Sequence, residues 1–177
     1  MFFDGASTPA SAGAGIVLIS PSKETIHLSY KLDFKTTNNI AEYEALLLGV
    51  NTAKEMGTMF LNIFGDANLI LQQANNTFQA KNVRLKAYRD EVWKLKDSFM
   101  FLDISYVPRA MNHLADSLVV SASMFISLLP PNMSYEIQVK YRPSLPDNVK
   151  FWNFFENYDE LSKFLQFIDD FFDMHID

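Results

Sequence analysis

Three segments near the start of the chain have the hydrophobic pattern of β-strands. The first segment, residues 2–4, is short and begins with apolar residues. The second, residues 15–20 (GIVLIS), is a continuous apolar run, and in the third, residues 25–32 (TIHLSYKL), apolar and polar side chains alternate. The sequence SPSKE at residues 20–24 has the composition of a turn. The second and third segments are therefore expected to form an antiparallel hairpin.

The middle of the chain alternates between helical and strand patterns. Apolar side chains recur at helical spacing from residue 40 onward, after the capping sequence TTNN, and Gly57 is expected to end this helix. The elements expected after it are a buried strand at 61–64, a short helix at 67–76, a longer helix at 83–99, a strand at 102–107 and a helix at 113–125 that Asn112 caps. This order predicts an α/β fold with a mixed sheet, an antiparallel hairpin on one side and helices on its faces.

The Pro-Pro pair at residues 130–131 is expected to separate a domain of residues 1–128 from an extension of residues 129–177. Within the extension, SYEIQVKY alternates cleanly and predicts a strand at about 134–141. A capping-box pattern and helical spacing predict a helix at about 158–174. The apolar side of that helix is interpreted as a docking face.

Composition restricts the class of protein further. The chain has 177 residues, 49% hydrophobic residues and no cysteine, which excludes disulfides and thiolate metal sites. No apolar run reaches the length of about 18 residues that crossing a bilayer requires. The start of the chain has neither a basic segment nor a long apolar one, so no secretory signal is expected. We therefore expect an intracellular protein, cytoplasmic or nuclear, with no membrane partner.

The net charge of −6 is concentrated toward the end of the chain. Residues 1–128 carry 12 acidic and 11 basic side chains, whereas residues 129–177 carry 9 acidic and 4 basic ones. If acidic residues of the first part hold divalent cations, its remaining surface is net positive, as a nucleic-acid partner requires. The overall acidity therefore does not exclude such a partner.

Four acidic residues occupy comparable places in the predicted elements. Asp4 and Asp66 end strands, and Glu42 and Asp116 lie in the first turns of helices. If the two strands are adjacent and parallel, Asp4 and Asp66 face one crevice at their carboxyl ends. Crowded carboxylates repel unless a cation intervenes, and all-oxygen ligation suits Mg²⁺ or Mn²⁺. Taken singly, each residue has an ordinary alternative as a turn, helix-dipole or solvated residue.

Four motifs around these acids, FDGAS, TTNNIAEYEALLLG, FGDANLI and YVPRAMNHLADSL, occur in a specific order and spacing. On these motifs, residues 1 to about 125 resemble the type 1 ribonuclease H domain, most closely the version in LTR-retrotransposon polyproteins. The resemblance implies a ribonuclease H-like mixed sheet of five strands, with the C-terminal strand and helix as an extension. It also implies that Asp4, Glu42, Asp66 and Asp116 are the catalytic ligands of two Mg²⁺ ions, for which Mn²⁺ can substitute.

Members of this family cleave the RNA strand of RNA–DNA hybrids endonucleolytically and leave 3′-hydroxyl and 5′-phosphate ends. One metal ion activates water and the other stabilises the leaving 3′-oxygen. The extension is similar to the connector that precedes integrase in such polyproteins. The partners that the resemblance implies are therefore an RNA–DNA hybrid and the reverse transcriptase and integrase domains of a polyprotein.

The resemblance also implies a set of substrate-binding residues: Gly5, Thr37, Asn38, Asn39 and Asn68. The asparagines would contact 2′-hydroxyls, Thr37 would hold a phosphate of the DNA strand, and Gly5 would allow close backbone approach. Helix capping is the alternative for residues 37–39.

Three basic residues of the predicted helix at 83–99 are candidate contacts to the nucleic-acid backbone: Arg84, Lys86 and Arg89. Acidic residues are interspersed among them, so a solvated helix face is an equally good interpretation.

Two of the chain's departures from the family affect the activity that is expected of it. Three residues precede Asp4, so the first strand is expected to be short and Asp4 loosely held. The loop at 108–112 lacks a histidine that relatives often use in proton transfer or product release, although Arg109 and His113 are near it in sequence. These departures support an alternative: a catalytically impaired nucleic-acid-binding or assembly domain, a retrotransposon relic. A DNA-cleaving nuclease of the same fold is a third hypothesis.

Overall fold

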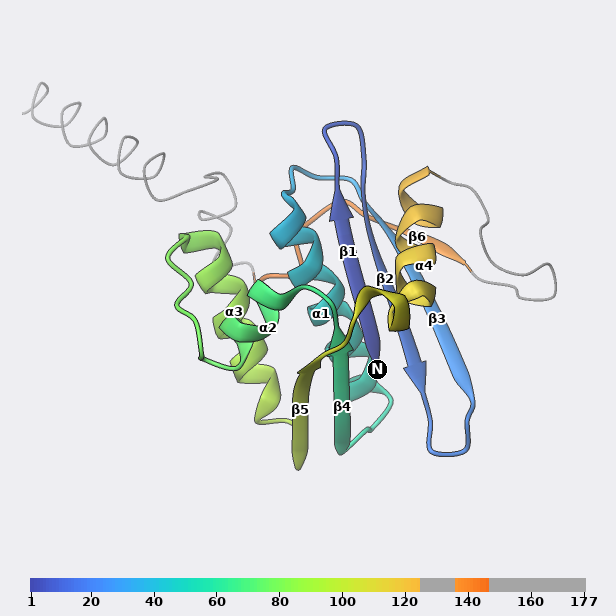
Figure 1. Ribbon diagram of the computed structural model, residues 1–177, viewed down its shortest axis with the longest axis vertical. Coiled ribbons are helices and arrows are strands. Elements are labelled where there is room, and N and C mark those ends of the chain that lie inside the picture. The colour runs from blue at the N-terminus through green and yellow to red at the C-terminus, as the bar shows by residue number, and fades with distance from the viewer. Residues whose placement is uncertain (125–135, 147–177) are drawn as a thin grey trace, which may run out of the picture.

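The described residues fold around a six-stranded sheet. The computed structural model describes residues 1–124 and 136–146. The strands lie in the order β5-β4-β1-β2-β3-β6 (Figure 1). Their bounds are Phe2–Ser7 (β1), Ala12–Ile19 (β2), Thr25–Leu32 (β3), Phe60–Gly65 (β4), Phe101–Tyr106 (β5) and Ile137–Lys140 (β6). β2 is antiparallel to both of its neighbours, β1 and β3, whereas β4, β5 and β6 pair in parallel with their neighbours. The predicted mixed sheet with its hairpin is confirmed, and β6 adds a sixth strand.

β1 and β2 are both longer than the hydrophobic pattern predicts. β1 pairs with β2 along its whole length and continues three residues past Asp4. β2 begins at Ala12 rather than at residue 15. The small residues of these segments carry no hydrophobic signal, but they let a helix approach the sheet: a Cβ at Gly15 would lie 2.3 Å from the carbonyl oxygen of Ala115. The expectation of a short first strand is therefore wrong.

Helices cover both faces of the sheet. Their bounds are Asn38–Glu55 (α1), Asn68–Ala74 (α2), Val83–Lys96 (α3) and His113–Met124 (α4), with a 3₁₀ turn at Arg109–Met111 (η1). α4 packs on β2 and β3 in front of the sheet, and α1 packs on β1 and β2 behind it (Figure 1). In β2, accordingly, Gly15 faces α4 whereas Ile16 lies against Gly49 of α1. In the part of the chain that the structure describes, none of the helices combines the length and the hydrophobicity of a membrane span.

α1 is buried on more sides than a single apolar stripe predicts. The residues of the predicted stripe are all at most 2% exposed: Ile40, Tyr43, Leu46, Leu47 and Val50. α3 covers the side of α1 that is turned away from the sheet, where the rings of Tyr43 and Tyr88 stack with centroids 5.7 Å apart. Thr37 is the N-cap of α1, and its hydroxyl accepts a hydrogen bond from the backbone N–H of Ile40 at 3.4 Å. α1 is therefore firmly placed between the sheet and α3.

The first part of the predicted extension belongs to this sheet. β6, which falls within the strand predicted at about 134–141, pairs in parallel with β3 at the sheet edge. The chain then crosses toward α1 (Figure 1), where the backbone N–H and the hydroxyl of Ser144 donate to the Glu44 carboxylate at 2.8 and 2.6 Å. Leu145 is buried in the main core. The boundary predicted near residue 129 and the helix predicted at about 158–174 lie outside the described residues.

Replacing Ser144 by alanine is expected to destabilise the fold. Glu44 has no exposed surface and also accepts a hydrogen bond from the Tyr88 hydroxyl. Losing the Ser144 hydroxyl leaves this buried carboxyl group with one donor fewer, which costs about 1–3 kcal/mol of the free energy of unfolding. Urea denaturation measures the change. The control is Ser22→Ala, since the Ser22 hydroxyl donates to Glu24 at an exposed site. Equal stability of the two variants would contradict the prediction.

Candidate functional site

Asp4 and Asp66 lie together because β1 and β4 are adjacent and parallel, as the sequence predicts. Asp4 is within β1, and Asp66 directly follows β4. Glu42 reaches the same place from α1. One carboxylate oxygen from each of the three residues lies within 4.8 Å of the other two. Three acids that are far apart in sequence therefore form one cluster, the Asp4–Glu42–Asp66 group.

Gly5 determines how Glu42 reaches this group. A Cβ at Gly5 would lie 2.2 Å from the carbonyl carbon and oxygen of Ala41, so a residue with a side chain would push α1 away from β1. At this contact the backbone N–H of Gly5 donates to Glu42 Oε2 at 3.0 Å. The sequence predicts Glu42 in the first turn of this helix. Because α1 begins at Asn38, Glu42 instead lies just beyond that turn. The sequence predicts that the backbone at Gly5 approaches another group closely, and in the structure that group is the backbone of α1.

Burial and mutual repulsion keep protons on this group unless a cation binds. Asp4 and Glu42 are each 7% exposed. Burial, followed by the negative charges of Asp4 and Asp66, raises the pKa of Glu42 to about 9. Burial, followed by the charges of Asp66 and Asp116, raises the pKa of Asp4 to about 7. A divalent cation between the oxygens would favour the ionised forms, and this all-oxygen donor set fits a hard cation such as Mg²⁺ or Mn²⁺.

Asp116 lies at the border of the group. It is in the first turn of α4, as predicted, and its charge raises the pKa of Asp4. It is not among the three residues whose oxygens lie within 4.8 Å of one another. Asp116 Oδ1 accepts a hydrogen bond from Arg109 Nη2 at 3.1 Å. The structure therefore places the fourth predicted acid beside Asp4, paired with a guanidinium group.

A pocket of about 300 Å³ opens beside the carboxylates. Four of the five residues that the resemblance assigns to substrate binding line it: Gly5, Asn38, Asn39 and Asn68. Arg109 lines it as well. The fifth residue, Thr37, is outside the lining and caps α1. Asn38 also has a structural contact, because its Oδ1 accepts a hydrogen bond from the backbone N–H of Ser7 at 3.1 Å. For Thr37 the helix-capping alternative is confirmed, and a phosphate contact stays a prediction.

The three basic residues expected to contact a nucleic-acid backbone lie in different environments. Arg84 is 2% exposed, and its Nη2 donates to the carbonyl oxygen of Lys35 at 3.1 Å. The expectation of a surface contact is therefore wrong for Arg84, which packs into the interior. Arg89 is mostly buried and forms an ion pair with Asp90 at 2.8 Å. Of the three, Lys86 alone is exposed.

Asn112 has a place that the sequence does not predict. As a helix cap its side chain would accept from an N–H of α4, but it turns inward instead. Its Nδ2 donates to the carbonyl oxygen of Phe3 at 2.8 Å and to Asp66 Oδ1 at 3.0 Å. An asparagine directly before a helix can cap that helix or can turn its side chain toward a strand. The sequence is the same in both cases, so it does not show which role Asn112 has. The sequence analysis also gives Arg109 no role in the site. Its position in the loop that leads to Asp116 is a signal that could have indicated one.

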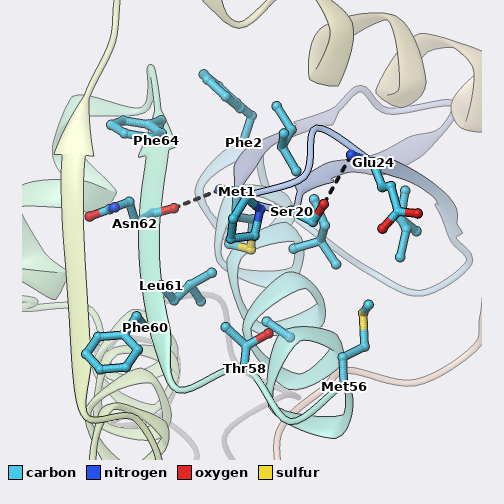
Figure 2. Close-up of a pocket in the computed structure, with 15 residues that line it drawn as sticks. Met1, Phe2, Ser20, Glu24, Met56, Thr58, Phe60, Leu61, Asn62 and Phe64 are labelled. Carbon is cyan, nitrogen blue, oxygen red and sulfur yellow. Dashed lines mark hydrogen bonds between the residues drawn. The ribbon is translucent and has the colours of Figure 1, made fainter.

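A larger pocket, of about 470 Å³, lies at the opposite ends of β1 and β4. Figure 2 shows apolar side chains around it, among them Phe2, Phe60 and Phe64. At its edge the amino group of Met1 donates to the carbonyl oxygen of Asn62 at 2.7 Å. Within the described part of the chain, the side chains grouped closely enough to share a metal ion are those of the Asp4–Glu42–Asp66 group. The acidic group that could hold a metal ion therefore lines the smaller pocket.

Known proteins with similar sequences match most of the described chain. Residues 2–122 match the family model described as reverse transcriptase-like. Ribonuclease HI of Halobacterium salinarum is 32% identical over 123 residues, which are 68% of this chain and 62% of that protein. A bifunctional protein of Mycobacterium tuberculosis is 30% identical over 122 residues, which are 67% of this chain and 34% of that protein. The chain thus covers less than two thirds of the length of these curated relatives.

Solved structures share the fold. The crystal structure of RNase H1 from Halobacterium salinarum matches with a TM-score of 0.65 and 31% identity, over 68% of this chain and 93% of that one. LC11-RNase H1, isolated from compost and solved in complex with an RNA/DNA hybrid, matches with a TM-score of 0.65 and 27% identity. That match covers 70% of this chain and 95% of the other. The arrangement of sheet and helices around the carboxylates is therefore one that solved proteins also have.

The metal-free protein is expected to lose stability as the pH rises. In the unfolded chain Asp4 and Glu42 titrate near their ordinary pKa of about 4, whereas in the folded protein their pKa values are about 7 and about 9. Between these limits the folded state holds more protons than the unfolded state, so the free energy of unfolding falls with increasing pH. Below about pH 4 both states are protonated and the effect is absent.

Thermal unfolding in chelator between pH 5 and pH 9 measures this dependence. The Tm of the unmodified protein is expected to fall across the range. It should fall less in Glu42→Gln, which carries no charge there at any pH. Added Mg²⁺ is expected to raise the Tm more at pH 8 than at pH 5, because the cation competes with protons. If the Tm falls equally with pH in the unmodified protein and in Glu42→Gln, the Glu42 carboxyl group is not the cause of the pH dependence.

Proposed function

This chain belongs to the reverse transcriptase-like family, and from that premise we propose that it is a ribonuclease H. In this proposal it hydrolyses the RNA strand of RNA–DNA hybrids endonucleolytically and depends on divalent metal ions. The observation that carries the proposal is the Asp4–Glu42–Asp66 group beside a polar pocket. Similarity to ribonuclease HI, and to an RNase H1 solved with an RNA/DNA hybrid, supports the choice of substrate.

Each acid of the site has a distinct place in the proposed reaction. The Asp4–Glu42–Asp66 group, with Asp116, would hold two Mg²⁺ ions, which when bound activate water and neutralise the leaving 3′-oxygen. Asp4 and Glu42 are fixed by the contact between β1 and α1, so their oxygens need little rearrangement during the reaction. Asp66 is the least buried member of the group and lines the pocket. Hydrolysis would leave a 3′-hydroxyl on one RNA fragment and a 5′-phosphate on the other.

Amide side chains would select RNA at the pocket. A 2′-hydroxyl both donates and accepts hydrogen bonds, and an asparagine side chain can answer either role. Asn38, Asn39 and Asn68 line the pocket from the starts of α1 and α2. Since Asn38 Oδ1 accepts from Ser7, its Nδ2 is the group that can donate to a ligand. Thr37 is exposed at the start of α1 and can contact a phosphate of the DNA strand while it caps the helix.

Arg109 would supply positive charge where relatives often hold a histidine. Its side chain is 79% exposed, lines the pocket and pairs with Asp116. A guanidinium group can bind a phosphate oxygen strongly, but it stays protonated and cannot shuttle a proton as a histidine does. We therefore assign Arg109 an electrostatic role toward the substrate phosphate, with no acid–base step in this loop.

The finer context is also part of the proposal. In this proposal the domain is of the LTR-retrotransposon type that the four motifs resemble, in which reverse transcriptase and integrase are domains of the same polyprotein. The reverse transcriptase-like description of the family supports this context. The extension of residues 129–177, which is similar to the connector, would then link the domain to an integrase domain, and β6 pairs with β3 at the edge of the sheet.

A second candidate function is nucleic-acid binding by a catalytically impaired domain. The loop at 108–112 lacks the histidine that relatives often hold, which favours this candidate. The other departure carries no weight, because β1 pairs fully with β2 and Asp4 is 7% exposed rather than loosely held. The two candidates share hybrid binding and differ in turnover, so one cleavage assay separates them.

Asp66→Asn is expected to lower the rate of RNA cleavage by roughly 100-fold or more, because it removes one ligand charge from the metal site. The assay uses a labelled RNA–DNA hybrid with Mg²⁺, and a chelator is expected to abolish cleavage. RNA–RNA and DNA–DNA duplexes, tested beside the hybrid, are expected to stay intact.

The matched control for this assay is Asp103→Asn, an exposed acid on β5 that is expected to leave cleavage unchanged. Cleavage by Asp66→Asn as fast as by the unmodified protein would rule out the proposed site. Salt-sensitive hybrid binding with no cleavage by the unmodified protein would favour the second candidate.

A further inference from the structure

We propose that Asn112 is a positioning residue that fixes the spacing of the metal-binding carboxylates. It lies between η1 and α4 and is 1% exposed. Its Nδ2 donates to the carbonyl oxygen of Phe3, the residue before Asp4, and to Asp66 Oδ1. A single amide thus connects the strand that carries Asp4 to the side chain of Asp66. The inference rests on the proposed function for the identity of the site, but its test measures metal binding and does not require cleavage.

The backbone of Asn112 adds a third connection. Its carbonyl oxygen accepts a hydrogen bond from the N–H of Asp116 at 3.1 Å, and its N–H donates to the carbonyl oxygen of Arg109 at 2.9 Å. Asp4, Asp66 and Asp116 come from β1, the end of β4 and α4, which are distant in sequence. One residue is therefore hydrogen-bonded at or beside each of these acids, so a shift of Asn112 would move them relative to one another.

The neighbours of the amide determine its orientation. The Phe3 carbonyl oxygen and Asp66 Oδ1 are both acceptors, so the NH₂ end of Asn112 must face them. Each of its two hydrogens then has one acceptor. Asn112 Oδ1 is buried and has no hydrogen-bond partner among the described residues. A buried acceptor without a partner is costly, and capping α4 would have supplied one. The side chain thus does not cap α4 but donates hydrogen bonds to Phe3 and Asp66 instead.

Metal binding needs this restraint because a hard cation requires oxygens at fixed separations. Without the amide, Asp66 Oδ1 loses its donor and β1 loses its connection to the start of α4. Groups that orient metal ligands in this way typically change metal affinity by about 10- to 100-fold when they are removed. Asn112 contacts ligands rather than reacting atoms, so its role is to position them.

The test compares Asn112→Ala with Ser29→Ala. Ser29 is also 1% exposed, and its hydroxyl donates to the carbonyl oxygen of Leu118 at 2.7 Å, so it connects β3 to α4 without touching a carboxylate. Mn²⁺ is titrated calorimetrically into each substrate-free protein, at a temperature where all are folded. Asn112→Ala is expected to bind Mn²⁺ about 10- to 100-fold more weakly and to lower kcat for the hybrid more than it changes KM. Ser29→Ala is expected to lower the Tm while Mn²⁺ affinity stays within about twofold of the unmodified protein.

Unchanged Mn²⁺ affinity in Asn112→Ala would overturn the inference, and so would equal losses in both variants, since these would reflect general destabilisation. If Asn112→Ala does not fold, the unmodified ¹⁵N-labelled protein provides the test. The side-chain amide protons of Asn112 are expected to exchange slowly with solvent and to shift when Mg²⁺ is added. Fast exchange with no shift would overturn the inference. A protein that cleaves no hybrid but whose Mn²⁺ affinity falls in Asn112→Ala would reject the proposed function and keep this inference.

Discussion

The rest of this structure depends on one constraint: three carboxyl groups, two of them buried, each place one oxygen within 4.8 Å of the other two. Burial and repulsion raise the pKa of Glu42 to about 9, so the fold is less stable here than it would be with neutral side chains. The contact at Gly5 keeps Glu42 in place, because α1 lies against β1 and the Gly5 N–H donates to Glu42. Local instability of this kind is typical of functional sites. The pocket, Arg109 and the asparagines acquire their proposed roles from their nearness to this group.

Helices reach the group from both faces of the sheet, through contacts that small residues permit. Gly5 lets α1 approach one face, which brings Glu42 to the group. Gly15 lets α4 approach the other face, which brings Asp116 and Asn112. A larger side chain at either glycine would move a helix and the acid that it carries. The positions of the acids in the site therefore depend on the close packing of α1 and α4 against the sheet, and a change in one changes the other.

The parts of the fold with a clear periodic pattern are predictable from the sequence. β3 occupies residues 25–32, as predicted, because its apolar and polar side chains alternate. The beginning of β2 and the end of β1 are not predictable in this way, because small residues show no pattern until a helix lies against them. The cluster of Asp4, Glu42 and Asp66 is predictable because adjacent parallel strands carry or precede the two aspartates and Glu42 lies near the start of a helix, although Asp4 is within β1 rather than at its end. The burial of Arg84 and the inward turn of Asn112 are not, because each depends on contacts between distant segments.

The central claim is that the Asp4–Glu42–Asp66 group is a site for hard divalent cations. Anomalous diffraction from crystals grown with Mn²⁺ tests it most directly, because it locates the ions without any assay of activity. Manganese peaks are expected within bonding distance of oxygens of all three carboxylates, with Asp116 at a second ion. Crystals saturated with Mn²⁺ that show manganese elsewhere and none between these three carboxylates would contradict the claim.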